Sequence, residues 1–294
     1  MRKLLAFAAS LVMGAAASPA VAQSVPAAPS GFTLTWADDF EAAAGTGLDT
    51  ADWTYSTGCC FGVGQVATMT TSTDNVYHDG QGNLVIKAIK DSRARWTSGR
   101  FETNRGDFGA APGGVMRVQA SMQLPDVTTE NGKGYWPGFW LLGTGIRTGG
   151  QWPDVGEIDI MENVNGLPEI FATLHCGAYP GGPCDEPNGI GSGPVACNGC
   201  KTQFRTYAME VDRSKAVEEI RFYLDNTNYY TLKATDVDAT TWARAVDHDF
   251  FILFDMYIGG DFPDGYCNCR TPDRRSTVGG GMLKIAYVAV YNKP

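Results

Sequence analysis

VMRVQASMQL, residues 115–124, alternates apolar and polar side chains more regularly than any other part of the chain. The apolar positions are Met116, Val118, Ala120, Met122 and Leu124, and the positions between them hold Arg117, Gln119, Ser121 and Gln123. A period of two is typical of a β-strand with one face in a core and the other in water. The pattern therefore predicts a half-buried strand over 115–124.

Other segments of the chain have the same character. Strand-like runs occur at 84–89, 139–142, 170–174, 204–211, 220–224, 250–258 and 282–291. Asn165-Gly166 supplies a hairpin turn between two of the expected strands. No long stretch holds apolar residues at helical spacing, and 36 Gly and 15 Pro divide the chain into short segments. We therefore expect an all-β fold of two packed antiparallel sheets.

The N-terminal residues 1–22 have the organisation of a secretory signal peptide. Arg2 and Lys3 precede an apolar stretch over 4–17, and Ala20-Val21-Ala22 ends it. The stretch is shorter than the roughly 20 residues of a spanning helix, so we expect a secreted or periplasmic protein without a membrane anchor. Residues 23–31 form a short Pro/Ala/Ser linker. Residues 32–294 show no repeat or change of composition, which favours a single domain.

Net charge and cysteine content narrow the choice of partners. The formal net charge of −9 disfavours nucleic acid and anionic membranes, whereas a neutral polymer meets no electrostatic objection. The eight Cys of an exported chain predict disulfides, with the pairing left open. A zinc cluster of Cys197 and Cys200 with His175-Cys176 is the disfavoured alternative.

Three acids stand close together in the octapeptide GEIDIMEN, residues 156–163. In a regular strand Glu157 and Asp159 share one face, while Glu162 points to the other. A β-bulge near Ile160-Met161 would return Glu162 to the face of the other two acids. The sheet must also be curved, with its concave face on this side, for the carboxyl groups to act on one atom.

Such a cluster suits glycoside hydrolysis. Two carboxyl groups about 5–5.5 Å apart serve as nucleophile and acid in a retaining glycosidase. Three like charges cannot all ionise cheaply, so we expect at least one shared proton at moderate pH. A solvated strand face or a calcium site would explain the acids alone. Trp152-Pro153 and the segment Trp136 to Leu142 favour a saccharide cleft, because aromatic faces stack on sugar rings.

The chain resembles a family 16 glycoside hydrolase of the laminarinase-like, β-bulged type, with the signature E-x-D-x-x-E at Glu157, Asp159 and Glu162. Further landmarks follow in family order over nearly the whole mature chain. They are Trp36-Ala-Asp-Asp-Phe40, Asn75, Asn83-Leu84-Val85-Ile86, Thr97-Ser98-Gly99-Arg100, Trp136-Pro-Gly-Phe-Trp140, Thr173-Leu174-His175, Phe204-Arg-Thr-Tyr207, Ile258-Gly259-Gly260 and Tyr287-Val-Ala-Val-Tyr291.

The resemblance implies a jelly-roll β-sandwich of two antiparallel sheets, similar to concanavalin A, whose concave face forms a cleft. It implies that residues 32–294 are the catalytic domain of a secreted, retaining, endo-acting hydrolase of β-glucan, with β-1,3 or mixed β-1,3/1,4 linkages. The expected partner is a neutral polysaccharide, and we expect a monomer. No cofactor is required. A structural calcium ion occurs in the family, but Ala286 stands where a calcium-holding Asp is common.

The resemblance also implies roles for individual residues. Glu157 would be the nucleophile, Glu162 the general acid and base, and Asp159 the residue that orients and tunes the nucleophile. The residues alone leave the choice between the two Glu open. The implied substrate-binding residues are Trp152, Trp140, Trp136, His175, Asn75 and Arg100. A core position is equally open for the tryptophans at 136 and 140, and His175 is expected to hydrogen-bond Glu162 or a sugar hydroxyl.

Three other functions stay open. A non-catalytic carbohydrate-binding sandwich is disfavoured by the intact acids, and a hydrolase of agar or carrageenan by the lack of a basic patch beside them. A transglycosylase uses the same intermediate and is not separable by sequence. The Gly/Pro-rich segment 176–200 contains four Cys, and we expect it either to wall one end of the cleft or to act as a structural staple.

Overall fold

The computed structural model describes residues 23–294, so the predicted signal peptide 1–22 lies outside the described residues. No helix in 23–294 has the length and apolar character needed to cross a membrane. The predicted linker 23–31 contains neither strand nor helix, and it packs on the outside of a sheet. There the hydroxyl of Tyr291 donates to the carbonyl oxygen of Pro26 at 2.9 Å.

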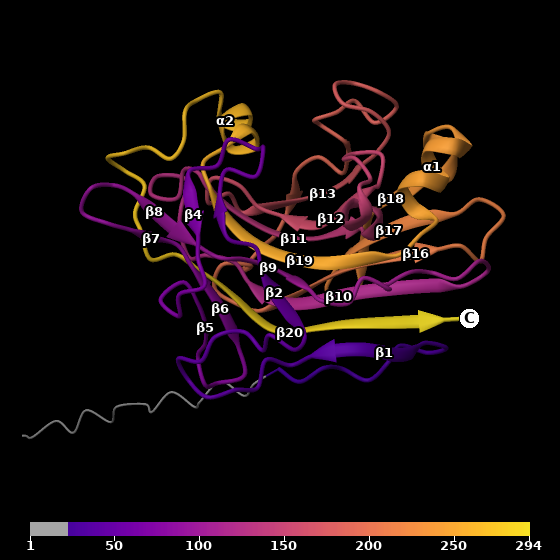
Figure 1. Cartoon of the computed structure of the whole chain (residues 1–294), viewed down its shortest axis with the longest axis horizontal. Helices are drawn as coiled ribbons and strands as arrows, with labels where there is room; N and C mark the ends of the chain where they lie inside the picture. The colour runs from indigo at the N-terminus through magenta and orange to yellow at the C-terminus, as the bar shows by residue number, and fades with distance from the viewer. Residues whose placement is uncertain (1–22) are drawn as a thin grey trace, which may run out of the picture.

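Two antiparallel sheets packed face to face form the body of the molecule (Figure 1). The first sheet has the order β18 (Thr227–Lys233), β17 (Glu219–Leu224), β16 (Arg205–Asp212), β10 (Val115–Gln123), β20 (Met282–Lys293), β6 (Leu84–Lys87) and β5 (Val76–His78), and β1 (Thr33–Asp38) also pairs with β20. The second has the order β14 (Ile190–Gly191), β13 (Glu169–His175), β12 (Glu157–Glu162), β11 (Tyr135–Gly143), β19 (Phe250–Ile258), β9 (Arg100–Thr103) and β2 (Trp53–Tyr55), and β15 (Val195–Ala196) pairs with β13.

The smaller elements lie at the edges of this sandwich. A third sheet joins β3 (Gly58–Cys59), β4 (Ala67–Met69), β8 (Trp96–Ser98) and β7 (Ile89–Lys90). The described part of the chain has two α-helices, α1 (Ala239–Val246) and α2 (Asp261–Cys267), and two 3₁₀-helices at Thr144–Thr148 and Ala234–Asp236. The prediction of an all-β jelly-roll sandwich is confirmed.

The core lies between the two sheets, where alternate side chains of facing strands meet. Met116 and Val118 of β10 belong to the same buried cluster as Phe139 of β11 and Phe254 of β19. The last two rings stack with centroids 4.7 Å apart. Burial of such large apolar side chains stabilises the fold by about 1.5–3 kcal/mol each, and it fixes which face of each strand points outward.

The prediction that 115–124 is half-buried is wrong, because β10 is buried on both faces. Arg117 forms an ion pair with Glu210 at 3.0 Å. Gln119 donates from Nε2 to the hydroxyl of Tyr287 at 3.1 Å. Protein groups thus replace water around the polar side chains. A period-two pattern shows only that two faces differ, and it cannot distinguish a solvated face from one with fixed polar partners.

The hairpin and the helix α1 show where local signals succeed and fail. Asn165 and Gly166 both have positive φ, of 58° and 65°, as the central residues of a type I′ turn between β12 and β13 require. That prediction is confirmed. Helix α1 was not predicted. It has eight residues, and Asp238 caps it by accepting from the backbone N–H groups of Thr240 and Thr241. Two turns are too short for a helical period to stand out.

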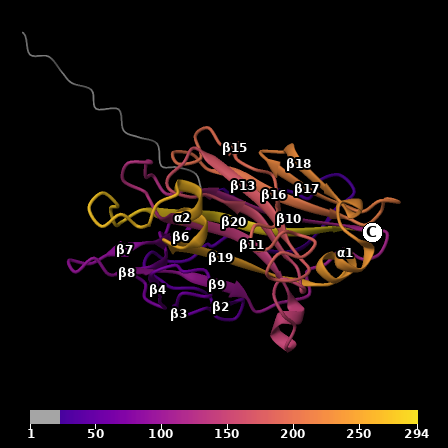
Figure 2. The same cartoon turned by 90° about the horizontal axis from the view of Figure 1, so that it is seen from above.

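The outer face of the second sheet is framed by loops. In Figure 1, α2, the segment 176–200 and α1 all rise on the side of the second sheet that faces away from the first, and β19 bends toward that side near α2. Figure 2 looks onto this face, with α2 toward one end and α1 toward the other. The curvature is the one that the acid cluster was expected to need.

Candidate active site

The predicted bulge in β12 is present. β11 places Trp140 opposite Asp159 but Phe139 opposite Met161, so Ile160 is an extra residue in β12. Three side chains of β12 are buried in the core between the sheets: Ile158, Ile160 and Met161. Two consecutive core-facing residues reset the alternation of the strand. The three acids Glu157, Asp159 and Glu162 therefore share the outer face.

Two of the predicted tryptophans stand beside these acids on β11. The indole N–H of Trp136 donates to Oε1 of Glu162 at 2.7 Å. The indole N–H of Trp140 donates to Oδ2 of Asp255, a residue of β19, at 2.8 Å. Trp140 is buried, but it packs with Trp152 in a small cluster on the outer face and not in the core between the sheets. The structure thus brings all three predicted tryptophans to the side of the acids.

His175 takes a different partner from the one expected. Its Nε2 lies 3.2 Å from Oδ2 of Asp159, and its Nδ1 lies 2.7 Å from Oε2 of Glu186. The expectation of a hydrogen bond to Glu162 is wrong, and the strand register explains why. His175 pairs with Glu157, whereas Glu162 pairs with a position four residues earlier in β13. Four strand steps span about 13 Å, which is too far for direct contact.

The ring of Trp152 lies next to His175. The two ring centroids lie 5.6 Å apart, and the ring of Tyr179 lies 6.0 Å from that of Trp152. Trp152 is only half-buried, so part of its surface remains open to solvent. An exposed indole beside three acids offers an apolar platform for a sugar ring.

Arg100 and Asn75, which were predicted together, have separate positions. Arg100 lies on the acids' side, where its Nη1 donates to the hydroxyl of Tyr257 at 2.7 Å. Asn75 is buried, and its amide is engaged by the backbone of Lys87 and the hydroxyls of Thr97 and Thr70. It precedes the edge strand β5 of the first sheet and presents no free polar group to a substrate.

The surroundings of the acids oppose their ionisation. Burial raises the pKa of Glu157, and the negative charge of Asp159 raises it further. Burial and then Asp159 likewise raise the pKa of Glu162 well above its ordinary value, against the lowering effect of the Trp136 hydrogen bond. Burial raises the pKa of nearby Asp255 to about 7. The raised pKa values agree with the expectation that the crowded cluster keeps at least one proton at moderate pH.

The charge of His175 is decided by its two carboxylate neighbours. Burial acts to lower the pKa of His175, but the contacts with Asp159 and Glu186 outweigh burial and raise the pKa well above its ordinary value. Glu157, Asp159 and His175 each offer a ligand atom within 4.8 Å of the others. A metal would need a lone pair on the imidazole, whereas the contacts with Asp159 and Glu186 favour a proton on both ring nitrogens.

The cysteines form four disulfides between residues close in sequence: Cys59–Cys60, Cys176–Cys184, Cys197–Cys200 and Cys267–Cys269. The prediction of disulfides is confirmed, and the disfavoured zinc cluster is not formed. Segment 176–200 contributes two short strands, β14 and β15, to the edge of β13, although its sequence showed no strand pattern. The same segment carries Glu186 to His175.

Sequence reasoning missed Glu186, Asp255 and Tyr257. For Asp255 a signal was available: it is the only charged residue in β19, a strand whose nine residues are all buried. A lone carboxylate in such a run needs a specific partner, here Trp140. Tyr257 lies two positions further along the same face. Glu186 could not be predicted, because the sequence of an irregular loop does not indicate which of its side chains will contact a strand.

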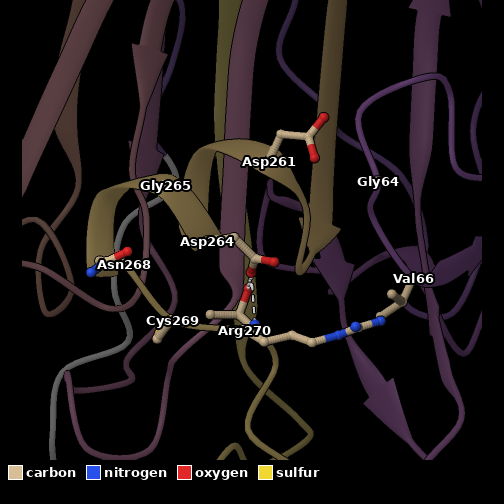
Figure 3. A pocket seen from close by; sticks show the side chains of 9 residues that line it. Gly64, Val66, Asp261, Asp264, Gly265, Asn268, Cys269 and Arg270 are labelled. Carbon is tan, nitrogen blue, oxygen red and sulfur yellow. Dashed lines mark hydrogen bonds between the residues drawn. The ribbon is translucent and has the colours of Figure 1, made fainter.

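A cavity of about 610 Å³ lies beside α2 (Figure 3). Its lining includes Gly64 and Val66 on one side and residues of 261–271 on the other, but none of the three acids. Figure 3 shows the side chain of Arg270 extended toward Val66. Phe262 of α2 packs edge-on against Trp136 with ring centroids 5.9 Å apart.

A bulged strand with three acids beside indoles, on the outer face of a β-sandwich, is an arrangement suited to glycoside hydrolysis. The family model of the XgeA-like catalytic GH16 domain matches residues 120–188. The β-glucanase of Rhodothermus marinus is 30% identical over 238 residues, which cover 78% of this chain and 76% of that protein. The chain therefore belongs to glycoside hydrolase family 16.

Two further comparisons agree with this assignment. The crystal structure of endo-1,3-β-glucanase from Streptomyces sioyaensis matches with a TM-score of 0.87 and 44% identity, over 92% of this chain and 99% of that one. Glucan endo-1,3-β-glucosidase A1 of Niallia circulans is 29% identical over 291 residues. The match covers 90% of this chain but 38% of the length of that relative.

Proposed function

We propose that this chain is a secreted, retaining endo-β-glucanase that hydrolyses β-glucans with β-1,3 or mixed β-1,3/1,4 linkages. The observation that carries the proposal is the bulge at Ile160, which places Glu157, Asp159 and Glu162 on one outer face. The relatives named as β-glucanase and endo-1,3-β-glucanase support glucan as the substrate. The net charge of −9 suits a neutral polysaccharide.

The reaction proceeds in two displacements at the anomeric carbon. Ionised Glu157 attacks that carbon while Glu162 gives its proton to the departing glycosidic oxygen, so one sugar fragment leaves and a covalent glycosyl-enzyme forms. Glu162, now a carboxylate, then takes a proton from water as the water oxygen attacks the same carbon. Glu157 departs as a carboxylate, and two inversions give overall retention.

The neighbours of the acids support this division of roles. The N–H of Trp136 stabilises Glu162 in the carboxylate form that follows proton delivery. Asp159 stands between the two Glu in the strand and has His175 as its counter-charge. A proton held on Glu162 removes one negative charge from the cluster, which eases the ionisation of Glu157.

The remaining parts of the proposal concern location and partners. Residues 1–22 direct export to the periplasm or the medium, and the eight Cys suit an oxidising compartment. The enzyme acts as a monomer and needs no cofactor, because the two Glu supply both nucleophile and acid. Calcium is not part of the reaction, so activity should survive dialysis against EDTA.

The direct test is hydrolysis of a panel of polysaccharides by the mature protein. Laminarin and lichenan should yield new reducing ends, agarose and carrageenan none, and Glu157→Gln should be inactive on all four. Activity confined to agarose or carrageenan would replace glucan by galactan as the substrate. Transfer products formed at the expense of free reducing ends would indicate a transglycosylase. Absence of activity on every polymer, with binding retained, would favour a carbohydrate-binding sandwich.

A further inference from the structure

Glu186 is a buried carboxylate that the mechanism above does not use. Its side chain is fully buried, although it comes from the irregular segment 176–200. Oε2 lies 2.7 Å from Nδ1 of His175, and Oε1 accepts from the backbone N–H of Cys176 at 2.8 Å. A buried carboxylate is stable only with such partners, and both partners are consecutive residues at the end of β13.

The loop that carries Glu186 is built to hold it there. The disulfide Cys176–Cys184 closes the loop immediately beside the two residues that Glu186 contacts. Glu186 also exchanges two backbone hydrogen bonds with Gly181, of 2.6 and 2.7 Å. These covalent and backbone links fix the carboxylate before any substrate arrives, so little ordering is needed at the moment of reaction.

His175 is the link between Glu186 and the catalytic acids. Its Nε2 lies 3.2 Å from Oδ2 of Asp159, a charge contact, and this buried oxygen has no hydrogen-bond partner among residues 23–294. Only an imidazolium carries a proton on both ring nitrogens, so carboxylates on both sides favour the charged ring. The charged groups that face this ring are Asp159 and Glu157 from β12 and Glu186 from the loop.

We propose that Glu186 is a positioning residue for catalysis: it holds His175 in the charged form beside Asp159, and through that charge it keeps the nucleophile Glu157 ionised at the working pH. The proposal rests on the proposed function, which makes Glu157 the nucleophile. Glu186 itself touches neither substrate nor reacting atoms. The stapled segment 176–200 thereby serves the chemistry as well as the fold.

The direction of the effect follows from the order of the charges around Glu157. The positive charge of His175 lowers the pKa of Glu157, and Glu186 raises it by a smaller amount. Neutralising Glu186 leaves His175 with one carboxylate contact in place of two, so the ring loses its proton at lower pH. Glu157 then loses the positive charge of His175, which favours its ionisation, together with the weaker opposing charge of Glu186. The net result is a higher pKa for the nucleophile.

The variant Glu186→Gln removes the negative charge at this position and keeps the shape of the side chain. The Gln side chain can still accept from Cys176 and can donate its amide N–H to a neutral imidazole. We expect the acidic limb of kcat/KM on laminarin to move to higher pH. On that limb kcat/KM should fall by roughly threefold to tenfold, because ten-fold corresponds to one pH unit. KM at the optimum should change little, since Glu186 makes no contact with substrate.

A second measurement observes His175 directly. The chain has only three His, so the imidazole nitrogens can be assigned by ¹⁵N correlation spectra with Glu186→Gln, His175→Gln and the unaltered protein. The pH at which His175 loses its proton should be lower in Glu186→Gln than in the unaltered protein. Asp185→Asn is the matched control: it removes an exposed carboxylate one residue away, hydrogen-bonded to Asn188, and should change neither readout.

The outcomes that overturn the proposal are specific. An unchanged titration of His175 in Glu186→Gln, or an unmoved acidic limb, would show that Glu186 is only a structural anchor. Equal shifts in Glu186→Gln and Asp185→Asn would indicate a general effect of surface charge and would also reject it. If the unaltered protein hydrolyses no glucan, the proposed function fails, and the spectra still decide whether Glu186 holds the charge of His175.

Discussion

The outer faces of the two sheets carry similar acids with opposite electrostatic surroundings. On the first sheet, Glu210 and Asp212 alternate along β16, and Arg221 binds both, at 2.9 and 2.7 Å. Burial acts to raise the pKa of Glu210, but hydrogen bonds from Arg221, Tyr223 and Arg117 outweigh it, and the pKa is lowered. Both acids of β16 are therefore ionised at neutral pH and serve to hold strands together.

The acids of β12 lack such partners. Within residues 23–294 neither Glu157 nor Glu162 forms an ion pair with an Arg or Lys. Arg100 lies on the same face, but its Nη1 donates to Tyr257. Burial then raises the pKa of both Glu, so Glu162 keeps a proton for transfer, while Glu157 depends on the positive charge of His175 for its ionisation. The comparison teaches that an acid is structural where a guanidinium neutralises it and reactive where burial outweighs the favourable groups around it.

The largest effect is expected from removing the nucleophile. Glu157→Gly should lower kcat on laminarin by a factor of about 10³ or more, because no covalent intermediate can form. Azide should restore turnover of an activated β-glucosyl substrate by filling the space of the lost carboxylate. The product should be the α-glycosyl azide, identified by NMR. A β-configured azide would instead mean that position 157 is not the nucleophile.

Removing the proton donor should have a smaller effect that depends on the leaving group. Glu162→Gln should lower kcat/KM on laminarin by about 10²–10⁴-fold, the usual contribution of general acid–base catalysis. An aryl glycoside with an acidic phenol leaving group needs little protonation, so its cleavage step should be affected far less. The matched control is Glu210→Gln, the same change on the first sheet, which should retain full activity. Equal losses on both substrates would contradict the acid role of Glu162.

For stability, in contrast to activity, the larger loss is expected from the acid on the first sheet. Glu210→Gln should lower the free energy of unfolding at pH 7 by about 1–3 kcal/mol, because it leaves Arg117 without an anionic partner and removes one of the carboxylates that Arg221 binds. The pKa of Glu210 is lowered in the folded state, so its contribution is present above the unfolded pKa of about 4.3 and is lost as pH falls through the folded value. Denaturant titrations at pH 7 and pH 3 should show the difference disappear.

The smallest effect is expected for the free energy of unfolding of Glu157→Gln, and it is a gain in stability where Glu210→Gln gives a loss. Its folded pKa is raised, so its favourable contribution is present below the unfolded pKa and is lost as pH rises through the folded value. Glu157→Gln, which cannot ionise, should therefore be more stable than the unaltered protein at pH 9 by on the order of 1 kcal/mol, and no more stable at pH 4. Thermal unfolding at the two pH values measures this. Equal shifts in the unfolding temperature at pH 9 and pH 4 would contradict a raised pKa of Glu157 in the folded protein.

The faces of β12 could be predicted from sequence, while the partners of its side chains could not. Ile158, Ile160 and Met161 are apolar, so their burial in the core could be predicted. Because the acids stand among them, the strand needs a bulge to bring all three acids to the other face. The contact of His175 with Asp159 depends on the register of β13, which no single strand encodes. The burial of Arg117 on β10 depends on Glu210, which lies 93 positions away in sequence.

The site's outer contacts depend even more on tertiary structure. Asn75 matched a family landmark, but its amide is engaged by Lys87 of the first sheet and Thr97 of the third. Glu186 matched nothing, yet it reaches His175 because the disulfide Cys176–Cys184 and the pairing with Gly181 turn the loop back toward β13. A match to a family motif therefore predicts where a residue lies in the fold. Which side chains contact each other there is shown only by the folded loops.

The most direct test of the central claim, that the bulge gives Glu157 and Glu162 distinct roles at one anomeric carbon, is to trap the covalent intermediate. A 2-deoxy-2-fluoro β-glucosyl or laminaribiosyl fluoride slows both displacements, and peptide mass spectrometry locates the sugar. We predict one glycosyl group per molecule, attached to Glu157. A label on Glu162 or on any other residue, or an active enzyme that is never labelled, would contradict the account.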